Sequence, residues 1–447
     1  MGFTYRLAQF ALDNYSFDRL PAAVVERSKE MMVNAAGVAL AAAAQPEGRT
    51  LTQYVQEMQG NGKCTIIGMG LRTSPIYAAL ANGTMMHLLD FDDEMFETGV
   101  HPSCTVLPVV LALGELNGYA GKNVLAAYAL GCEVTAKLGG ICNPAWPQDG
   151  VAGHIGATVA AALLLGLEAG QIEGAVGLAC GEAGGIQANL ATGSGALQCG
   201  RAAMNGIMSA TLAQRGFAGA KNALEAPGGL LDVYGRLNEL DEDAFFRELG
   251  NPYDIVDPGV ALKLYPCESA SHTTIDAVLQ LMQQYHIESD QVLAVDVGVT
   301  PQALQRLRYP TPQTGREARF CLSYIVAATL LHGPPLIDFF SDTALQDSEV
   351  RRMMDRVSVV ATEKATPLIA NPSNLEITLA DGRRLKHRVE FARGQPELPL
   401  DPEELNAKFL YCSRYILPPD HIEETIGSFR NLENIENVTG MVSVLGG

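Results

Sequence analysis

Positive charge is scarce in this sequence. Lys and Arg total 31 against 50 Asp and Glu, and the formal net charge of the 447 residues at pH 7 is −19. Such a charge repels phosphate backbones and anionic lipid headgroups, so we expect neither nucleic acid nor a membrane surface as a partner. A small anionic substrate would need a few Lys, Arg or His side chains gathered in one place, and these are the residues to look for.

The sequence also lacks the motifs of common cofactor and nucleophile sites. No GxGxxG follows an expected strand, and neither a phosphate-binding loop nor a GxSxG turn is present. Nine cysteines are scattered without a CxxC pair or a Cys/His ligand spacing. Their odd number in a long chain indicates reduced thiols, and we expect a cytoplasmic protein.

Long apolar runs are missing too. Stretches such as "ATVAAALLLGL" and "SYIVAATLL" fall short of the roughly 20 residues that cross a bilayer, and the N-terminal segment does not have the layout of a signal peptide. We therefore expect no membrane span.

What the first half does contain is a succession of Ala-, Leu- and Gly-rich segments of helical length, from Tyr5 to about Ala220. Each ends at Gly or near Pro, as helices commonly do. Many carry small residues on most faces, which permits close backbone approach and predicts a tightly packed helical bundle.

The pattern changes after about Pro258. Segments such as "VLAVDVGVT", "RVSVVATEKA" and "NLEITLADGRRLKHRVEF" are typical of strands, and Asp381-Gly382 predicts a two-residue hairpin turn. "SHTTIDAVLQLMQQYH", "REARFCLSYIVAATLLHG" and "DSEVRRMMDRV" favour helices between them, and helical spacing returns at the C-terminus. The length favours two domains. We predict a mainly α protein with a large all-α domain formed by both chain ends, residues 1–256 and 395–447, and an inserted α+β domain, residues 257–394.

Two histidines stand where helices are expected to begin. His101 precedes Pro102 and Ser103, good first-turn residues for the apolar helix that follows, and His154 begins "HIGATVAAALLLG". A helix N-terminus favours an anionic ligand, so the two histidines together could bind carboxylates. A capping loop is the alternative for His101.

Three further side chains stand out in the second half. Lys263 lies in an apolar setting before Pro266, where desolvation could lower its pKa and let it act as a base or anchor a carboxylate. A lysine that extends its amino group to the surface is the alternative. His272 begins an expected helix, and the phenol of Tyr324 on an apolar helix needs a partner or a function.

The acidic run "HLLDFDDEMFETGVHPS" allows three interpretations. Asp90, Asp92 and Asp93 could hold Mg²⁺, although no second aspartate-rich motif accompanies them. They could form a solvated loop, although the neighbouring Leu and Phe residues are apolar. One buried aspartate could instead orient a histidine or hold a substrate hydroxyl.

Taken in order, "LANGTMMHLLDFDDE", "HPSCTVLPVVLALGE", "GHIGATVAAALLLGL", "KLYPCESASHTTIDA" and "PTPQTGREARFCLSYIVAATLLHG" resemble the MmgE/PrpD family over nearly the whole chain. That family includes 2-methylcitrate dehydratase, cis-aconitate decarboxylase and iminodisuccinate epimerase. The resemblance implies a helical domain built from both chain ends, an α+β lid domain, usually a homodimer, and neither metal nor organic cofactor.

The resemblance also implies an active site between the two domains. Members of the MmgE/PrpD family share one chemical step, in which a proton is removed from or added to a carbon next to a carboxylate. The expected substrate is therefore a small carboxylate anion. We predict catalytic roles for Lys263, His101 and Tyr324. The predicted substrate-binding residues are His154, Asp90, His272 and Arg201.

One segment departs from the family pattern. Where relatives usually have K-P-L-H-x-G-x-A-A, this chain has "GALQCGRAA", with Gly195 at the lysine position and Gln198 at the histidine position. Arg201 could compensate for the lost cations. The departure favours an epimerase of a substituted dicarboxylate, of the iminodisuccinate epimerase kind. The alternatives are a dehydratase of a hydroxy-polycarboxylate, a cis-aconitate-type decarboxylase, and a non-catalytic carboxylate-binding protein.

Overall fold

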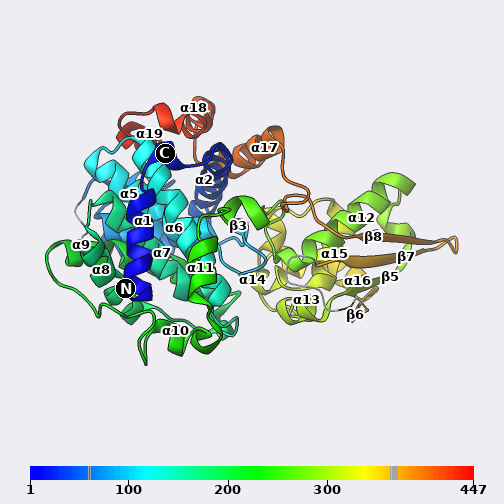
Figure 1. Ribbon diagram of the computed structural model, residues 1–447. Coiled ribbons are helices and arrows are strands. Elements are labelled where there is room, and N and C mark those ends of the chain that lie inside the picture. Colours follow the sequence, from blue (N-terminus) through cyan, green and yellow to red (C-terminus); the bar gives the residue numbers. More distant parts are fainter. Residues whose placement is uncertain (59, 61, 363, 365–370) are drawn as a thin grey trace. The chain divides into compact units, whose positions relative to one another are not determined.

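The computed structural model describes residues 1–58, 60, 62–362, 364 and 371–447. The chain divides into two compact units. The helical unit comprises Met1–Leu88, Asp92–Val260 and Asp401–Gly447, and the mixed unit comprises Leu89–Phe91 and Ala261–Leu400. The helical unit thus contains both chain ends, seen as blue and red ribbons in Figure 1.

Helices dominate the helical unit, and the expectation of a mainly α protein is confirmed. In chain order they are α1 (Phe3–Asn14), α2 (Ala22–Ala43), α3 (Pro46–Glu57), α4 (Pro75–His87), α5 (Pro102–Asn117), α6 (Gly121–Ile141), α7 (Gln148–Leu164), α8 (Ala169–Glu182), α9 (Gly193–Gln214), α10 (Leu230–Val233), α11 (Glu242–Glu248), α17 (Pro402–Ser413), α18 (Pro419–Arg430) and α19 (Thr439–Val444). Helix α17 packs against α2, which joins the two chain ends.

The sequence predicted that this unit is all-α, but it also contains three short strands. Strands β1 (Cys64–Ile66) and β2 (Leu71–Thr73) form an antiparallel pair, and the two-residue β3 (Asp93–Glu94) lies in the acidic run. The backbone N–H of Thr65 in β1 donates to the carboxylate of Glu115 on α5. A bond from outside the strand pair therefore fixes this short hairpin against the bundle.

Helices α5, α6 and α7 form the centre of the helical unit. Every residue of α7 is buried, as the small residues on all its faces predicted. Helix α6 is long and apolar enough to cross a membrane by length and composition, contrary to the expectation that apolar stretches are too short. However, 83% of its most apolar stretch is buried inside the structure, and the core helix of a globular domain can have the same length and apolar composition.

The mixed unit is built on a four-stranded sheet with the order β6-β5-β7-β8. Its strands are β4 (Ala261–Leu262), which lies outside this sheet, β5 (Val292–Val299), β6 (Val357–Ala361), β7 (Ser373–Leu379) and β8 (Arg384–Val389). Strands β5 and β6 are parallel, and the other pairs are antiparallel. The predicted hairpin between β7 and β8 forms, but its turn is not the predicted two-residue one. The backbone N–H of Leu379 donates to the carbonyl of Arg383, so the three residues 380–382 connect the strands, with Gly382 at φ +88°.

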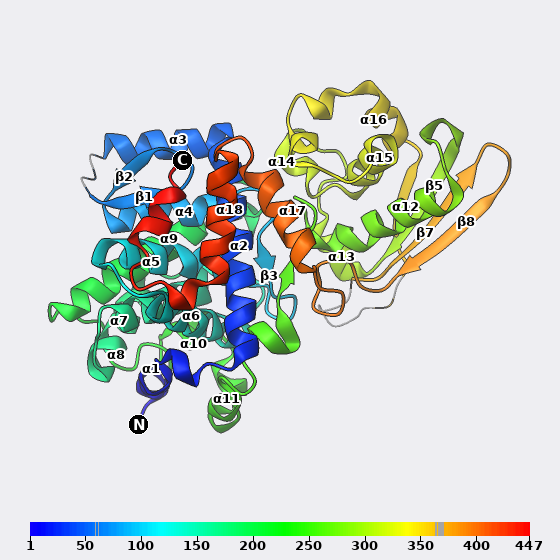
Figure 2. The same cartoon turned by 90° about the horizontal axis from the view of Figure 1, so that it is seen from above.

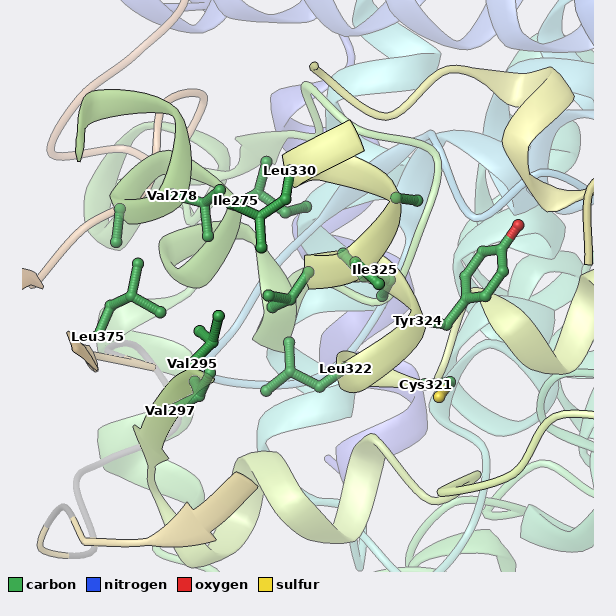
Figure 3. Packing of buried hydrophobic residues seen from close by; sticks show 14 of the residues in the cluster. Ile275, Val278, Val295, Val297, Cys321, Leu322, Tyr324, Ile325, Leu330 and Leu375 are labelled. Atoms are coloured by element: carbon green, nitrogen blue, oxygen red, sulfur yellow. The ribbon is translucent and has the colours of Figure 1, made fainter. Parts of the chain in front are cut away.

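Helices α12 (His272–Tyr285), α13 (Pro301–Arg306), α14 (Gly315–Ala318), α15 (Leu322–His332) and α16 (Ser348–Met354) complete the mixed unit. Figure 2 shows α12 along the strands β7 and β8, which it contacts. Figure 3 shows the core, where side chains of α12 and α15 meet those of β5 and β7.

The single helix predicted over "REARFCLSYIVAATLLHG" is wrong, because α14 and α15 are separate. Between them Cys321 has extended backbone angles, φ −116° and ψ 101°. The carbonyl of Arg319 accepts a hydrogen bond from the backbone N–H of Glu268, outside the helix. A tertiary bond thus replaces the one that would continue the helix.

Candidate active site

His101 lies at the N-cap of α5, as predicted, and Pro102 begins the helix. Its backbone N–H donates to Oδ1 of Asp149 at 2.6 Å. The residue is 7% exposed. Backbone anchoring and the following proline, whose ring fixes φ, together hold the imidazole at a defined point on the helix start.

Asp92 joins His101 to a second histidine. Its Oδ2 lies 2.8 Å from Nδ1 of His87 and 3.4 Å from Nδ1 of His101. The two rings meet edge to face with centroids 4.5 Å apart. A fully buried carboxylate therefore holds two imidazoles from the end of α4 and the start of α5.

Electrostatics within this group favours the charged histidines. Burial alone disfavours the imidazolium of His101, but the carboxylates of Asp92 and Asp149 outweigh it and raise its pKa to about 9. The pKa of His87 is likewise raised well above its usual value despite burial, chiefly by Asp92, whose own pKa is held well below its usual value by the two histidines. Near neutral pH His101 is thus a protonated acid.

The pKa of the neighbouring Asp93 is shifted in the opposite direction to that of Asp92. Its Oδ2 accepts a hydrogen bond from the backbone N–H of Ser103, while within the described residues Oδ1 is buried without a partner. Burial and the adjacent Asp92 raise the pKa of Asp93 to about 6. Ionisation of this carboxyl near neutral pH therefore destabilises the folded state.

We expect Asp93→Asn to remove a pH-dependent loss of stability. A folded-state pKa above the ordinary value means that the protonated form stabilises the fold and that stability falls as pH rises from about 4 through about 6. An asparagine can still accept from Ser103 and does not titrate. Relative to wild type, the variant should gain up to about 3 kcal/mol between pH 4 and neutral pH in urea unfolding. Parallel pH profiles for the two proteins would contradict the assignment.

The acidic run is not a solvated loop. Asp92, Asp93 and Glu94 are fully buried. Within the described part of the chain, side chains that could hold an ion gather in two sets that share His87, and neither includes Asp90 or Asp93. The third interpretation, an aspartate that orients a histidine, fits Asp92.

His154 does not begin a helix, contrary to the prediction. Helix α7 begins six residues earlier, at Gln148, and the glycine at 150 lies inside it. A Cβ at Gly150 would lie 2.2 Å from the carbonyl oxygen of Gly184, so this glycine permits close packing and does not break the helix.

The imidazole of His154 is neutral. The amide of Asn205 donates to its Nε2 at 3.1 Å. Burial, together with the positive charge of Arg201, lowers the pKa of His154 to about 4. It can therefore donate or accept hydrogen bonds without carrying a charge, and the predicted binding of carboxylates by His101 and His154 together stays a prediction.

His154 and Arg201 line one cavity of about 340 Å³ in the helical unit. Gln198 and Asn189 contribute polar groups to the same wall, and Glu182 contributes a carboxylate. Helix α9 thus presents Gln198 and Arg201 to the cavity, one turn apart, while Cys199 between them is buried. The structure brings together two of the predicted binding residues here.

In the mixed unit, the buried Lys263 forms an ion pair with the partly buried Asp90. Nζ of Lys263 lies 2.5 Å from Oδ1 of Asp90. Lys263 is 2% exposed, so it does not extend its amino group to the surface. Asp90 adopts a left-handed conformation with φ +52°, which costs energy for a residue other than glycine and is typical of functional positions.

The other two predicted residues also lie in the mixed unit. His272 is the first residue of α12, as expected, and its Nε2 donates to the carbonyl of Cys267 at 3.2 Å. The hydroxyl of Tyr324 donates to the carbonyl of Phe339 at 2.5 Å, and burial raises the pKa of Tyr324 to about 12. Figure 3 shows this hydroxyl directed away from the labelled core side chains. The catalytic role of Tyr324 stays a prediction.

Comparison with known proteins shows the family of this chain. Residues 5–243 match the MmgE/PrpD N-terminal domain, and residues 265–434 match the MmgE/PrpD C-terminal domain. The chain belongs to the MmgE/PrpD family.

Several relatives within this family are cis-aconitate decarboxylases. The one from Homo sapiens is 28% identical over 443 residues, covering 95% of this chain and 90% of the relative. The one from Mus musculus is 27% identical over 440 residues, covering 95% and 89%. The one from Aspergillus terreus is 24% identical over 473 residues, covering 99% and 96%. These relatives are lyases, and they give no support to the expectation of an isomerase.

His87, Asp92 and His101 form what we call the histidine group. The sequence did not predict two of its members, His87 and Asp92, as site residues. It named Asp90 from the acidic run, whereas Asp92 is the residue that the two histidines share. His87 stands five residues before Asp92, at the end of a helix, and that spacing was the available local signal. Asp149 is 48 residues from His101, and no local pattern connects them.

Proposed function

We propose that this chain is a lyase that removes CO₂ from a small unsaturated polycarboxylate, as the decarboxylase alternative from the sequence holds. The observation that carries the proposal is the fully buried carboxylate of Asp92, which lies within ion-pair distance of both His87 and His101. Its charge favours the protonated form of His101. The similarity to cis-aconitate decarboxylases supports the same reaction class.

The reaction needs an acid and a cationic surrounding. When the bond between carbon and the departing carboxylate breaks, CO₂ leaves and the electron pair stays on the carbon skeleton. A remaining carboxylate delocalises it as an enolate-type anion, which nearby positive charge stabilises. The imidazolium of His101 delivers its proton to carbon, and the neutral imidazole regains one from solvent. The sum is one proton consumed and one CO₂ released.

The surrounding residues supply orientation in this scheme. Asp92 keeps His101 protonated, and His87 adds positive charge beside it. Arg201 binds a substrate carboxylate in the cavity, and His154 offers a neutral hydrogen bond. For Lys263, which belongs to the mixed unit, the role in carboxylate binding or acid–base chemistry stays an expectation from the resemblance. No step calls on a metal or an organic cofactor.

The test is incubation of candidate acids in D₂O, with CO₂ release, product structure and deuterium content followed together. A decarboxylase releases CO₂ and places one deuterium on the product carbon. Exchange with inversion and no CO₂ would identify an epimerase, and a new alkene with loss of water would identify a dehydratase. Binding of carboxylates without any of these would identify a non-catalytic protein.

Replacing Arg201 tests the cavity. We expect Arg201→Gln to raise KM by about 10- to 100-fold, because a charge-assisted contact to a carboxylate is lost, with a smaller change in kcat. Arg215→Gln is the matched control, since Arg215 is an exposed arginine at the end of the same helix. Equal KM values for the two variants would remove Arg201 from substrate binding.

A further inference from the structure

The cavity wall carries little net positive charge. Among the lining residues that the structure describes, Arg201 and Glu182 are the charged ones, and their charges are opposite. Gln198, Asn189 and Ser194 are neutral hydrogen-bonding groups. The imidazole of His154 is neutral as well, because burial lowers its pKa to about 4.

The structure also closes the position where the resemblance places a lysine. A Cβ at Gly195 would lie 2.8 Å from the carbonyl oxygen of Asn189, which is backbone and cannot rotate away. The segment before α9 thus occupies space that a longer residue at 195 would need. The backbone at Asn189 therefore leaves little space for any side chain at position 195.

Gln198 is similarly fitted to its surroundings. Its Oε1 would lie 2.7 Å from a Cβ at Gly185 and 3.2 Å from a Cβ at Gly150. The amide thus packs tightly against two bare backbone segments. A neutral side chain is built into the wall where the resemblance would place a second ionisable group.

We propose that this cavity receives a single carboxylate, bound by Arg201 beside the neutral groups of Gln198 and Asn189, so that the chain prefers unsaturated dicarboxylates to tricarboxylates. This inference rests on the proposed function and names its substrate class. A second carboxylate in the cavity would lose its water without gaining a cation, which disfavours binding. Glu182 would repel it further.

The experiment compares kcat/KM for cis-aconitate and for alkene dicarboxylates of similar size, using the full chain and the CO₂ and D₂O assay described above. Wild type should prefer a dicarboxylate by at least about tenfold. Ser194→Lys adds a cation to the cavity wall and should move the ratio toward the tricarboxylate by about tenfold or more.

Gly193→Lys is the matched control. It adds the same charge one residue earlier, at an exposed position where a Cβ meets nothing within 4 Å and which does not line the cavity. Its ratio should stay near that of wild type. Equal shifts in both lysine variants would mean a general charge effect and would overturn the proposal, as would a wild-type preference for the tricarboxylate. No reaction with any carboxylate would instead contradict the proposed function itself.

Discussion

His101→Gln should lower kcat/KM by about 10²- to 10⁴-fold, the range typical of a lost general acid, while the protein stays folded. Glutamine is polar and of similar reach but carries no transferable proton. His101 is the residue whose charge and position both suit proton delivery, with a pKa of about 9 and a fixed place at the start of α5. The measurement is steady-state kinetics on the substrate identified by CO₂ release.

The control for this variant is His332→Gln, because the side chain of His332 is 41% exposed and lies outside the histidine group. Its activity should match that of wild type. A fully active His101→Gln would contradict the proposed acid.

Asp92→Asn separates proton delivery from simple packing. The protonated His101 is present below its raised pKa and is lost as pH rises through about 9, so activity should decline on that alkaline side. Removing the Asp92 charge lowers this pKa and should move the decline toward neutral pH. A structural loss would reduce activity at all pH values and leave the midpoint unchanged.

Lys263→Met should destabilise the mixed unit by about 3 kcal/mol, because it removes a nearly inaccessible amino group from its ion pair with Asp90. Lys263 is nearly inaccessible, and Asp90 holds a left-handed backbone conformation beside it. Urea unfolding followed by circular dichroism measures the effect. The control, Lys386→Met, removes an amino group that is 73% exposed in its pair with Glu376. That change should cost less than about 1 kcal/mol.

The double variant Lys263→Met/Asp90→Asn tests the cause. Asparagine tolerates the left-handed conformation and carries no charge, so it should restore part of the lost stability. Additive losses from the two substitutions would show that the pair is not coupled. The same proteins, assayed for CO₂ release, also test the predicted catalytic role of Lys263.

Elements with a strong local pattern were predicted well from sequence. The β7–β8 hairpin follows from Asp381-Gly382 between alternating strands, and the start of α5 follows from Pro102 after His101. Patterns that serve tertiary packing were misread. Gly150 resembles a helix breaker but lies inside α7, because the backbone at Gly184 approaches it closely. The break before α15 was missed for the same kind of reason, a bond to distant Glu268.

The sequence by itself determined the family, the mainly α composition and the presence of His101, Lys263 and Arg201 as candidate cations, because these depend on residue identity and local periodicity. Only the tertiary structure decided which carboxylate contacts which histidine. It placed Asp92 between two histidines, brought Asp149 to His101 from a different helix, and left His154 buried and neutral. Charge state depends on burial and on neighbours that are distant in sequence, and folding alone brings those neighbours together.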